Sequence, residues 1–250
     1  MDRPPLSAPL RRLRVVTWNV HRCRGLDRRT RPQRIARVLG ALQPDVVALQ
    51  EVLSLQGGAR EQDQAGFLAH ALGLRAHHGT NRMIAGARYG NVVLTHLPAR
   101  PGCNYDLSLP GFEPRGLLRV DLETGGGRVL HVFNAHLGVS FAERRGQARL
   151  LEACGLFDQG ALPGPRLLVG DFNEWTPTVA SRLLAARLRR ARPTSRLRWR
   201  RSYPGLLPVV EIDRVYYEGA LELRAHFAAR SLRALIASDH VPVVADFELG

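Results

Sequence analysis

The stretch Arg166–Trp175, RLLVGDFNEW, joins a short apolar run to a pair of polar side chains. The run Leu167–Val169 has the length and composition of a buried strand, and Gly170 interrupts it. Asp171 and Asn173 follow two residues apart, which places both side chains on one face of an extended chain. Such a pair can hold a water molecule, a metal-bound ligand or a phosphate oxygen. A plain Asp/Asn turn gives the same pattern, so the surrounding sequence has to decide.

Composition predicts one large domain over residues 1–250, with residues 1–12 as a flexible N-terminal arm. No apolar run reaches the ~18 residues of a membrane span, and the N-terminus lacks the apolar segment of a secretory signal. Cys23, Cys103 and Cys154 are too scattered for a disulfide framework or a metal-binding pair. We therefore expect a reducing, cytoplasmic location and a monomeric protein.

The formal charge is +14, and all 36 basic residues are arginine. The absence of lysine excludes both a P-loop lysine and a Schiff-base lysine. The charge favours anionic partners. An arginine bias along a whole chain also arises from amino-acid usage across a genome, without a role in binding. The densest basic run, Arg187–Arg201, has Trp199 within it and Tyr203 beside it. This pattern can bind nucleic acid or lipid head groups, and it also fits a solvated helix face followed by a loop.

The N-terminal part has the pattern of a β-α-β unit. A strand is expected over Arg14–Val20, a helix from Pro32, and a second strand over Asp45–Gln50. Because ligands gather at the carboxyl ends of parallel strands, Asn19 and Glu51 are candidate site residues.

The remaining elements are read from periodicity and from turn signals. Strands are expected over Leu74–His78, Asn91–Thr95, Arg115–Glu123, Arg128–His136, Ile212–Tyr217, Leu221–Phe227 and Val241–Phe247, and a loop over Pro98–Pro114. Helices are expected over Phe67–Leu72, after a Ser140–Glu143 capping box, and after a cap at Thr176-Pro177.

Polar residues recur at these strand ends, and together they supply what phosphoryl hydrolysis needs. Glu51 and Asp239 offer carboxylate ligands for a hard cation, with Asn19 and water completing the shell. His240 is the candidate base for the attacking water, with Asp213 fixing its tautomer.

The negative charge that develops on the phosphate in the transition state must be stabilised by hydrogen-bond donors that are already in place. Asn173, His136 and Arg115 can supply them. The candidate site residues also have structural explanations. Asp213 could be a charge on an edge strand, and Asp239 with His240 could form a turn. His136 could be a core histidine with its hydrogen bonds satisfied.

Six motifs in this order resemble the endonuclease/exonuclease/phosphatase superfamily. They are TWNVH, LQEV, NAHLG, GDFNEW, IDRVYY and SDHVPVVADF, and they span Asn19 to Phe247. Relatives include DNase I, exonuclease III-type enzymes, neutral sphingomyelinases and inositol polyphosphate 5-phosphatases. The resemblance implies a four-layer α/β/β/α sandwich of two mixed sheets flanked by helices. It also implies a Mg²⁺ or Mn²⁺ site at the edge where the strand ends meet.

Carried over by motif, Glu51 and Asp239 are expected as metal ligands and Asn19 as an amide near the metal. Asp171 is expected to orient or activate the water, Asn173 to position the phosphate, and Asp213 with His240 to form an orienting dyad.

Two further positions follow from the same resemblance. His136 is expected to contact the phosphate or the leaving group. The stretch RYGNVVLT resembles the family's GNAILS strand, which places Tyr89 and Asn91 near the pocket.

The sequence also departs from particular branches of this family. Abasic-site enzymes carry Tyr in place of His136 and LQETK in place of LQEV, which argues against abasic-site repair. DNase I is secreted and disulfide-bonded, unlike the protein expected here. The motifs are most similar to those of uncharacterised bacterial metal-dependent hydrolases.

The leading interpretation is a Mg²⁺- or Mn²⁺-dependent phosphodiesterase that uses a His-activated water. Its substrate would be nucleic acid or a phospholipid-like phosphodiester. A phosphomonoesterase of the inositol-phosphate type is the second interpretation. An inactive homologue that binds polyanions is the third, and the intact acidic and histidine motif residues argue against it.

Overall fold

A computed structural model describes residues 9–59, 61–158, 160–193 and 200–250. The strands are β1 (Arg12–Asn19), β2 (Val46–Ser54), β3 (Arg75–Ile84), β4 (Ala87–Thr95), β5 (Ala99–Asp106), β6 (Gly116–Gly125), β7 (Arg128–His136), β8 (Arg166–Asp171), β9 (Arg189–Arg190), β10 (Asp213–Glu218), β11 (Leu221–Ala228) and β12 (Val243–Leu249). The helices are the short 3-10 turn η1 (His21–Cys23), α1 (Pro32–Leu42), α2 (Gln64–Leu72), α3 (Phe141–Ala153), α4 (Val179–Arg187) and α5 (Leu232–Ala237).

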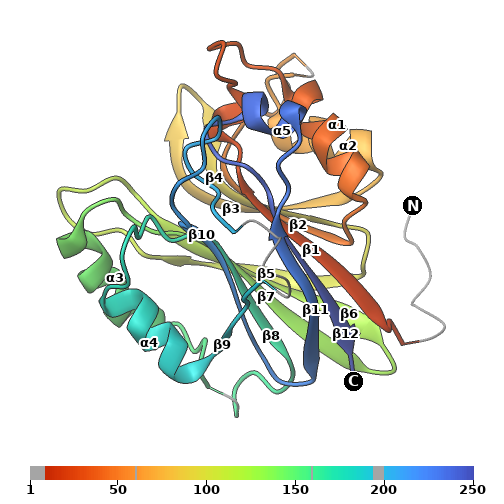
Figure 1. Ribbon diagram of the computed structural model, residues 1–250, viewed down its shortest axis with the longest axis vertical. Coiled ribbons are helices and arrows are strands. Elements are labelled where there is room, and N and C mark those ends of the chain that lie inside the picture. Colours follow the sequence, from red (N-terminus) through yellow and green to blue (C-terminus); the bar gives the residue numbers. More distant parts are fainter. Residues whose placement is uncertain (1–8, 60, 159, 194–199) are drawn as a thin grey trace.

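The described strands form two six-stranded sheets that face each other (Figure 1). The first has the order β11-β12-β1-β2-β4-β3 and the second β5-β6-β7-β8-β10-β9. Each sheet contains one parallel pair, β1 with β2 and β7 with β8, among antiparallel neighbours. Both sheets are therefore mixed, as the sequence predicts.

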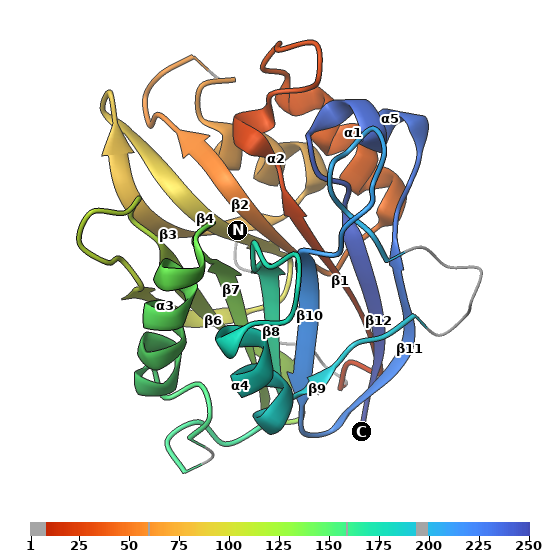
Figure 2. The ribbon, with the colours of Figure 1, turned by 60° about the vertical axis from the view of Figure 1, so that its left-hand side comes forward.

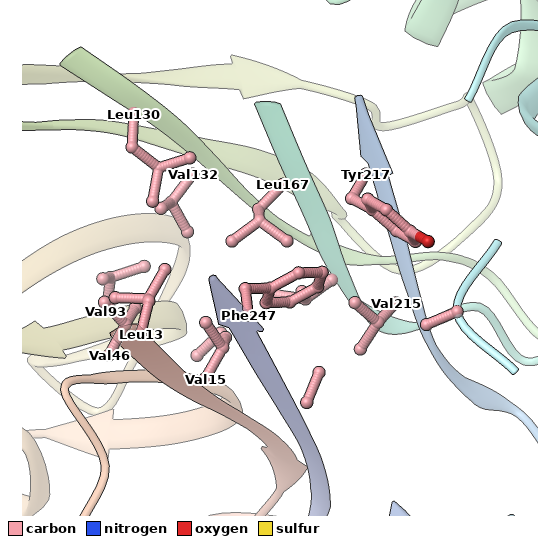
Figure 3. Packing of buried hydrophobic residues seen from close by; sticks show 14 of the residues in the cluster. Leu13, Val15, Val46, Val93, Leu130, Val132, Leu167, Val215, Tyr217 and Phe247 are labelled. Carbon is pink, nitrogen blue, oxygen red and sulfur yellow. The ribbon is translucent and has the colours of Figure 1, made fainter. Parts of the chain in front are cut away.

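Alternation along the strands builds the core between the sheets. Leu13 and Val15 of β1 point toward the second sheet, whereas Val16 and Trp18 point away from it. In Figure 3 the side chains of one sheet pack directly against those of the other, with Phe247 of β12 among them. The inward face of each strand is thus fixed by the period of two residues.

Helices cover the two outer faces, which completes the four layers. On the first sheet α1, α2 and α5 pack around Trp18, and on the second α3 and α4 pack around Phe133 and Phe172 (Figures 1 and 2). The predicted α/β/β/α sandwich of two mixed sheets is confirmed. None of the helices in the described ranges has the length and hydropathy needed to cross a bilayer.

The strand ends that carry the polar motifs meet at one edge of the sandwich. In the second sheet His136 of β7 is the register partner of Asp171 of β8, and Asp171 is the partner of Asp213 of β10. In the first sheet Asn19 of β1 is the register partner of Gln50 of β2. Three strands of one sheet and two of the other therefore deliver the candidate residues to the same place.

The loop predicted over Pro98–Pro114 is wrong in its first half, which forms β5. This segment, ARPGCNYD, contains a proline and a glycine and lacks the alternation of a half-buried strand. It pairs only with β6, and its register shifts between Arg100 and Cys103. An edge strand with a bulge tolerates proline because one side of its backbone has no partner.

The helix starts are partly as predicted. Ser140 caps α3 by accepting a hydrogen bond from the Glu143 backbone N–H. The cap of α4 is Thr178 rather than Thr176, and the Thr178 N–H donates to the Ser181 hydroxyl. The short elements α5 and β9 have too few residues to show a period and were not predicted.

The predicted N-terminal arm falls mostly outside the described residues, which begin at residue 9. The Leu10 N–H already donates to the Thr124 carbonyl at 2.7 Å, and β1 begins at Arg12. The last residues of the predicted arm are thus attached to β6.

We expect Gly170→Ala to destabilise the fold by at least about 2 kcal/mol in urea unfolding. Gly170 has φ 142°, and a Cβ atom there would collide with the Ala135 carbonyl oxygen of the adjacent strand. Gly73→Ala is the matched control, because Gly73 has φ 66° with no atom within 4 Å of an added Cβ. It should cost only the left-handed backbone penalty of about 1 kcal/mol. Equal losses in the two variants would contradict the close-approach explanation.

Candidate active site

Buried amide side chains connect the two sheets beside the site. Asn91 of β4 donates both Nδ2 hydrogens to the second sheet, to the Gly116 carbonyl at 2.9 Å and the Asn134 carbonyl at 3.0 Å. Asn134 of β7 donates in the opposite direction, to the Leu49 and Val92 carbonyls at 2.8 and 3.0 Å. Both Nδ2 hydrogens of Asn91 are therefore used by the fold, whereas its Oδ1 has no partner among the described residues.

Asp171 lies at the centre of the candidate site and is 1% exposed. Its Oδ2 accepts a hydrogen bond from Asn19 Nδ2 at 3.0 Å. The Nε2 atoms of His136 and His240 each lie 3.7 Å from the same oxygen. The structure thus brings together four residues predicted from four separate motifs.

His240 and Asp213 form the predicted dyad, with His240 Nδ1 2.8 Å from Asp213 Oδ2. Burial alone would lower the pKa of His240, but the carboxylates of Asp213 and Asp171 outweigh it and raise this pKa to about 10. The sequence predicts a base with the ordinary pKa of histidine, near neutrality. In the structure two buried carboxylates beside the imidazole therefore favour its protonated form.

The pKa of Asp171 moves toward neutrality. Burial raises this pKa to about 6; the charge of His240 opposes the rise and that of Asp213 adds to it. Asp171 therefore takes up a proton at higher pH than an exposed aspartate does.

His136 is held as a neutral donor. Its pKa lies well below the ordinary value because of burial, followed by the charges of Arg115 and His240. Arg115 Nη1 lies 3.3 Å from His136 Nδ1 and can only donate, so Nδ1 accepts and the ring proton lies on Nε2. Both histidines then direct an Nε2–H group toward Asp171.

Glu51 reaches the site through a bulge in β2. The register of β2 against β4 shifts between Leu49 and Val52, and Glu51 has φ 57°. In a regular strand Glu51 would lie on the same face as Leu49, under the helices; the bulge reverses it toward the site. Asn19 Nδ2 donates to Glu51 Oε1 at 3.0 Å, so one amide bridges Glu51 and Asp171. A left-handed glutamate costs roughly 1–2 kcal/mol, a cost typical of functional sites.

Asp239 lies beside His21, which is not among the predicted site residues. His21 Nδ1 is 3.1 Å from Asp239 Oδ2, and this contact raises the pKa of His21 against the opposing effect of burial. Ser238 fixes the segment by donating to the Asn19 carbonyl at 2.8 Å. The position of His21 two residues after Asn19 was the only available signal for it.

Three other predicted residues lie around this centre. Asn173 uses its backbone N–H for Asp171 Oδ1 and its Nδ2 for the Leu137 carbonyl, so it orders the loop and keeps part of its amide free. Arg115 is 6% exposed, pairs with Glu113, and has no partner for its Nε atom. Tyr89 is buried, and burial followed by the charge of Glu51 raises its pKa.

The donor set fits a hard divalent cation. Glu51, Asp171 and Asp239 supply carboxylate oxygens and Asn19 an amide group, which are the ligand types that Mg²⁺ and Mn²⁺ prefer. Within the described residues, one group of three metal-type ligand atoms lies within 4.8 Å of one another, from Asp171, Asp213 and His240. Because His240 and Asp213 are hydrogen-bonded to each other, this group is better suited to proton transfer than to metal binding.

A buried ion pair joins the segments before and after the site. Arg214 Nη1 donates to Glu174 Oε2 at 2.6 Å and Arg214 Nη2 to the Glu174 carbonyl at 2.8 Å. Glu174 is 0% and Arg214 2% exposed. They follow Asn173 and Asp213 directly, so the pair fixes two segments of the candidate site to each other. Both residues lie in recognised motifs, but only the strand pairing shows that they meet.

The described arginines at the start of the Arg187–Arg201 run contact the protein itself. Arg187 lies over the Phe157 ring, Arg189 lies over the Tyr217 ring, and Arg190 pairs with Glu211. The strand β9 pairs with Tyr216 and Tyr217, at the end of β10 opposite to Asp213. Residues 194–199 of the run lie outside the described residues.

A sequence model of the Endonuclease/Exonuclease/phosphatase family matches residues 16–240. The chain belongs to the endonuclease/exonuclease/phosphatase family. Membership in this family supports a hydrolase that acts on phosphate esters, and the family is generally dependent on divalent metals. The resemblance found in the sequence motifs is confirmed.

Relatives within the family align over almost the whole chain. The Uncharacterized protein YbhP of Escherichia coli K12 is 29% identical over 252 aligned positions, which cover 94% of this chain and 96% of YbhP. The crystal structure of an endonuclease/exonuclease/phosphatase from Beutenbergia cavernae is 27% identical with a TM-score of 0.73, and the match covers 96% of this chain and 72% of that one.

A more distant family structure shares the fold. The catalytic domain of human Nocturnin with bound sulfate has a TM-score of 0.73 at 20% identity, and the match covers 97% of both chains. At this identity the likeness shows the fold alone.

We expect Arg214→Met to lower the free energy of unfolding by about 3–5 kcal/mol, because it leaves the Glu174 carboxylate buried without its cation. Glu174→Gln keeps the size and the hydrogen-bonding groups and should cost less. The double variant should cost less than the sum of the single changes, as a double-mutant cycle in urea measures. Strict additivity would mean that the two residues do not interact energetically.

Proposed function

We propose that the protein is a divalent-cation-dependent phosphodiesterase in which a water molecule attacks phosphorus. The observation that carries this proposal is the buried chain Asp213–His240–Asp171, which adjoins Glu51 and Asn19 at the edge where both sheets end. Family membership supplies the chemistry of phosphate-ester hydrolysis.

The cation-binding residues in this proposal are Glu51 and Asp239, with Asn19 beside them. When bound, a divalent cation would polarise the phosphate and stabilise the charge that develops on the leaving oxygen. The bulge supports this role for Glu51, since the backbone accepts a left-handed glutamate there and aims its carboxylate at Asn19 and Asp171.

The base in this proposal is Asp171 rather than His240. With a pKa of about 6, Asp171 is mostly deprotonated at neutral pH and can accept the proton of the water. His240, held as a cation by Asp213, and His136, a neutral donor on Nε2, are the donors proposed for a phosphate bound beside Asp171. Arg115 supplies a permanent positive charge behind His136.

Two model substrates separate the diesterase proposal from the monoesterase alternative. Purified protein should hydrolyse bis(p-nitrophenyl) phosphate faster than p-nitrophenyl phosphate under the same metal conditions. The opposite order would favour the inositol-phosphate type of activity. Plasmid DNA, RNA, sphingomyelin and inositol phosphates then test the natural substrate class.

Removal of divalent cations with EDTA should abolish hydrolysis, and Mg²⁺ or Mn²⁺ should restore it. We expect Glu51→Gln to weaken Mg²⁺ binding by at least about tenfold in calorimetry, because a ligand carboxylate is lost. The control is Glu152→Gln, at an exposed glutamate on α3. Unchanged Mg²⁺ affinity in Glu51→Gln would reject the assignment of Glu51.

The pH dependence of kcat distinguishes the two candidate bases. A base acts in its deprotonated form, so activity should rise with pH through the pKa of Asp171, and a bound cation should move this rise below pH 6. Asp171→Asn should lower kcat by about 10²–10⁴-fold. His240→Gln removes a positive charge that lowers the pKa of Asp171, so the rise should move to higher pH. If His240→Gln instead removes the rise and Asp171→Asn retains it, His240 is the base.

A further inference from the structure

Large apolar side chains are exposed on the segments that border the candidate site. The described residues include twelve exposed large hydrophobic side chains, and seven of them lie on these segments. We call these seven the apolar rim: Phe112, Val139, Phe141, Trp175, Leu206, Leu207 and Val209. Such a concentration marks an interaction surface, since single exposed apolar residues are normally scattered.

Each rim segment continues directly from a strand end of the site. Phe112 precedes Arg115, Val139 follows His136, Trp175 follows Asp171, and Leu206 and Leu207 precede Asp213. In Figure 2 the segments after β7 and β8 and the segment before β10 extend from the same end of the second sheet.

Contacts bring two of these segments together over His240. The Tyr203 ring lies 4.9 Å from the His240 ring and 6.4 Å from the Trp175 ring, measured between centroids. The Gly205 N–H donates to the Asp239 carbonyl. Trp175, the exposed end of this row of tilted rings, is therefore at the mouth of the site.

Leu206 and Leu207 are held outward by a closed loop. The N–H groups of Val209 and Val210 donate to the Tyr203 carbonyl at 2.8 and 2.9 Å, which closes the loop below the two leucines. Their exposed fractions are 64% and 68%. The backbone is thus ordered while its most apolar side chains face solvent.

Positive charge accompanies the rim. Exposed arginines lie at the same end of the molecule. They are Arg22 on the turn after β1, Arg145 near the start of α3, Arg182 in the first turn of α4, and Arg201 before the loop that carries Leu206 and Leu207. None of these four forms an ion pair with another described residue. Two acidic neighbours of the rim are already paired, Glu113 with Arg82 and Arg115, and Glu211 with Arg190 and Arg200.

This combination fits a lipid surface better than a nucleic acid. Leucine and valine can neither stack on bases nor donate to phosphates, whereas they enter the boundary between head groups and acyl chains. Trp175 and Phe141 have the aromatic rings favoured at that boundary. Surrounding arginines are attracted to anionic head groups.

We propose that the apolar rim docks the protein on bilayers that contain anionic phospholipid, which presents the site to a lipid phosphodiester. This inference rests on the proposed function for its choice of substrate. The docking itself depends only on the rim and on the surrounding arginines.

Flotation with phospholipid vesicles tests the docking. The intact protein should float with phosphatidylcholine vesicles that contain phosphatidylglycerol, and less with pure phosphatidylcholine or at high salt. Leu206→Ser/Leu207→Ser should weaken vesicle binding by at least about tenfold, because burial of even one leucine contributes that much. Hydrolysis of soluble bis(p-nitrophenyl) phosphate should stay unchanged in this variant.

The matched control is Leu232→Ser/Ile236→Ser, a double change of exposed aliphatic residues on α5, which are outside the rim. It should bind vesicles like the unchanged protein. Equal binding by the rim variant and the unchanged protein, or no flotation of the unchanged protein, would overturn the proposal. The proposal would also be overturned if the protein bound single-stranded DNA tightly through Trp175 and did not bind vesicles.

The two proposals fail in different ways. Rim-dependent flotation of a protein that hydrolyses no phosphate ester would reject the proposed function and keep the docking surface. Hydrolysis of soluble diesters without flotation would reject the docking surface and keep the proposed function.

Discussion

The site depends on the buried amides that join the two sheets. Asn91 donates from the first sheet to backbone carbonyls of the second, and Asn134 donates back to carbonyls of the first. Gln50 extends the network by donating to Asn134 Oδ1 at 2.7 Å and to the Thr17 hydroxyl at 3.1 Å. A buried polar group without a partner is costly, so this network permits one relative placement of the sheets. Asn19 and Glu51 come from one sheet and His136, Asp171 and Asp213 from the other, so that placement sets the distances between them.

Concentrating acidic groups at this edge determines the chemistry available there. The charges of Asp213 and Asp171 raise the pKa of His240, and burial raises the pKa of Asp171. The same crowding of carboxylates favours a divalent cation, which relieves their repulsion. Glu174 and Arg214, fully desolvated beside the site, keep the loop after β8 and the start of β10 in register. In the proposed mechanism, proton transfer, cation binding and phosphate contact draw on this one electrostatic arrangement, and the proposed role of the exposed rim is to bring the substrate to it.

Much of this was available from local sequence pattern. Alternating apolar residues specified the strands, and a period of two residues fixed which side chains face the core, as in Leu13 and Val15 against Val16 and Trp18. Polar residues at the ends of those strands identified Asn19, Glu51, His136, Asp171, Asp213 and His240 as neighbours, and the order of the motifs identified the family. The strand β5 escaped prediction because its proline and glycine are tolerated only by its edge position.

What the sequence by itself determined is which residues can take part and which strand ends carry them, because periodicity and turn chemistry act between near neighbours in the chain. Only the tertiary structure decided their states and partners. The bulge that turns Glu51 to the site, the pKa of His240, the use of Asn91 as a cross-link, and the pairing of Glu174 with Arg214 all arise from contacts between segments far apart in sequence. Burial and charge depend on everything packed around a group, and packing is a property of the folded chain as a whole.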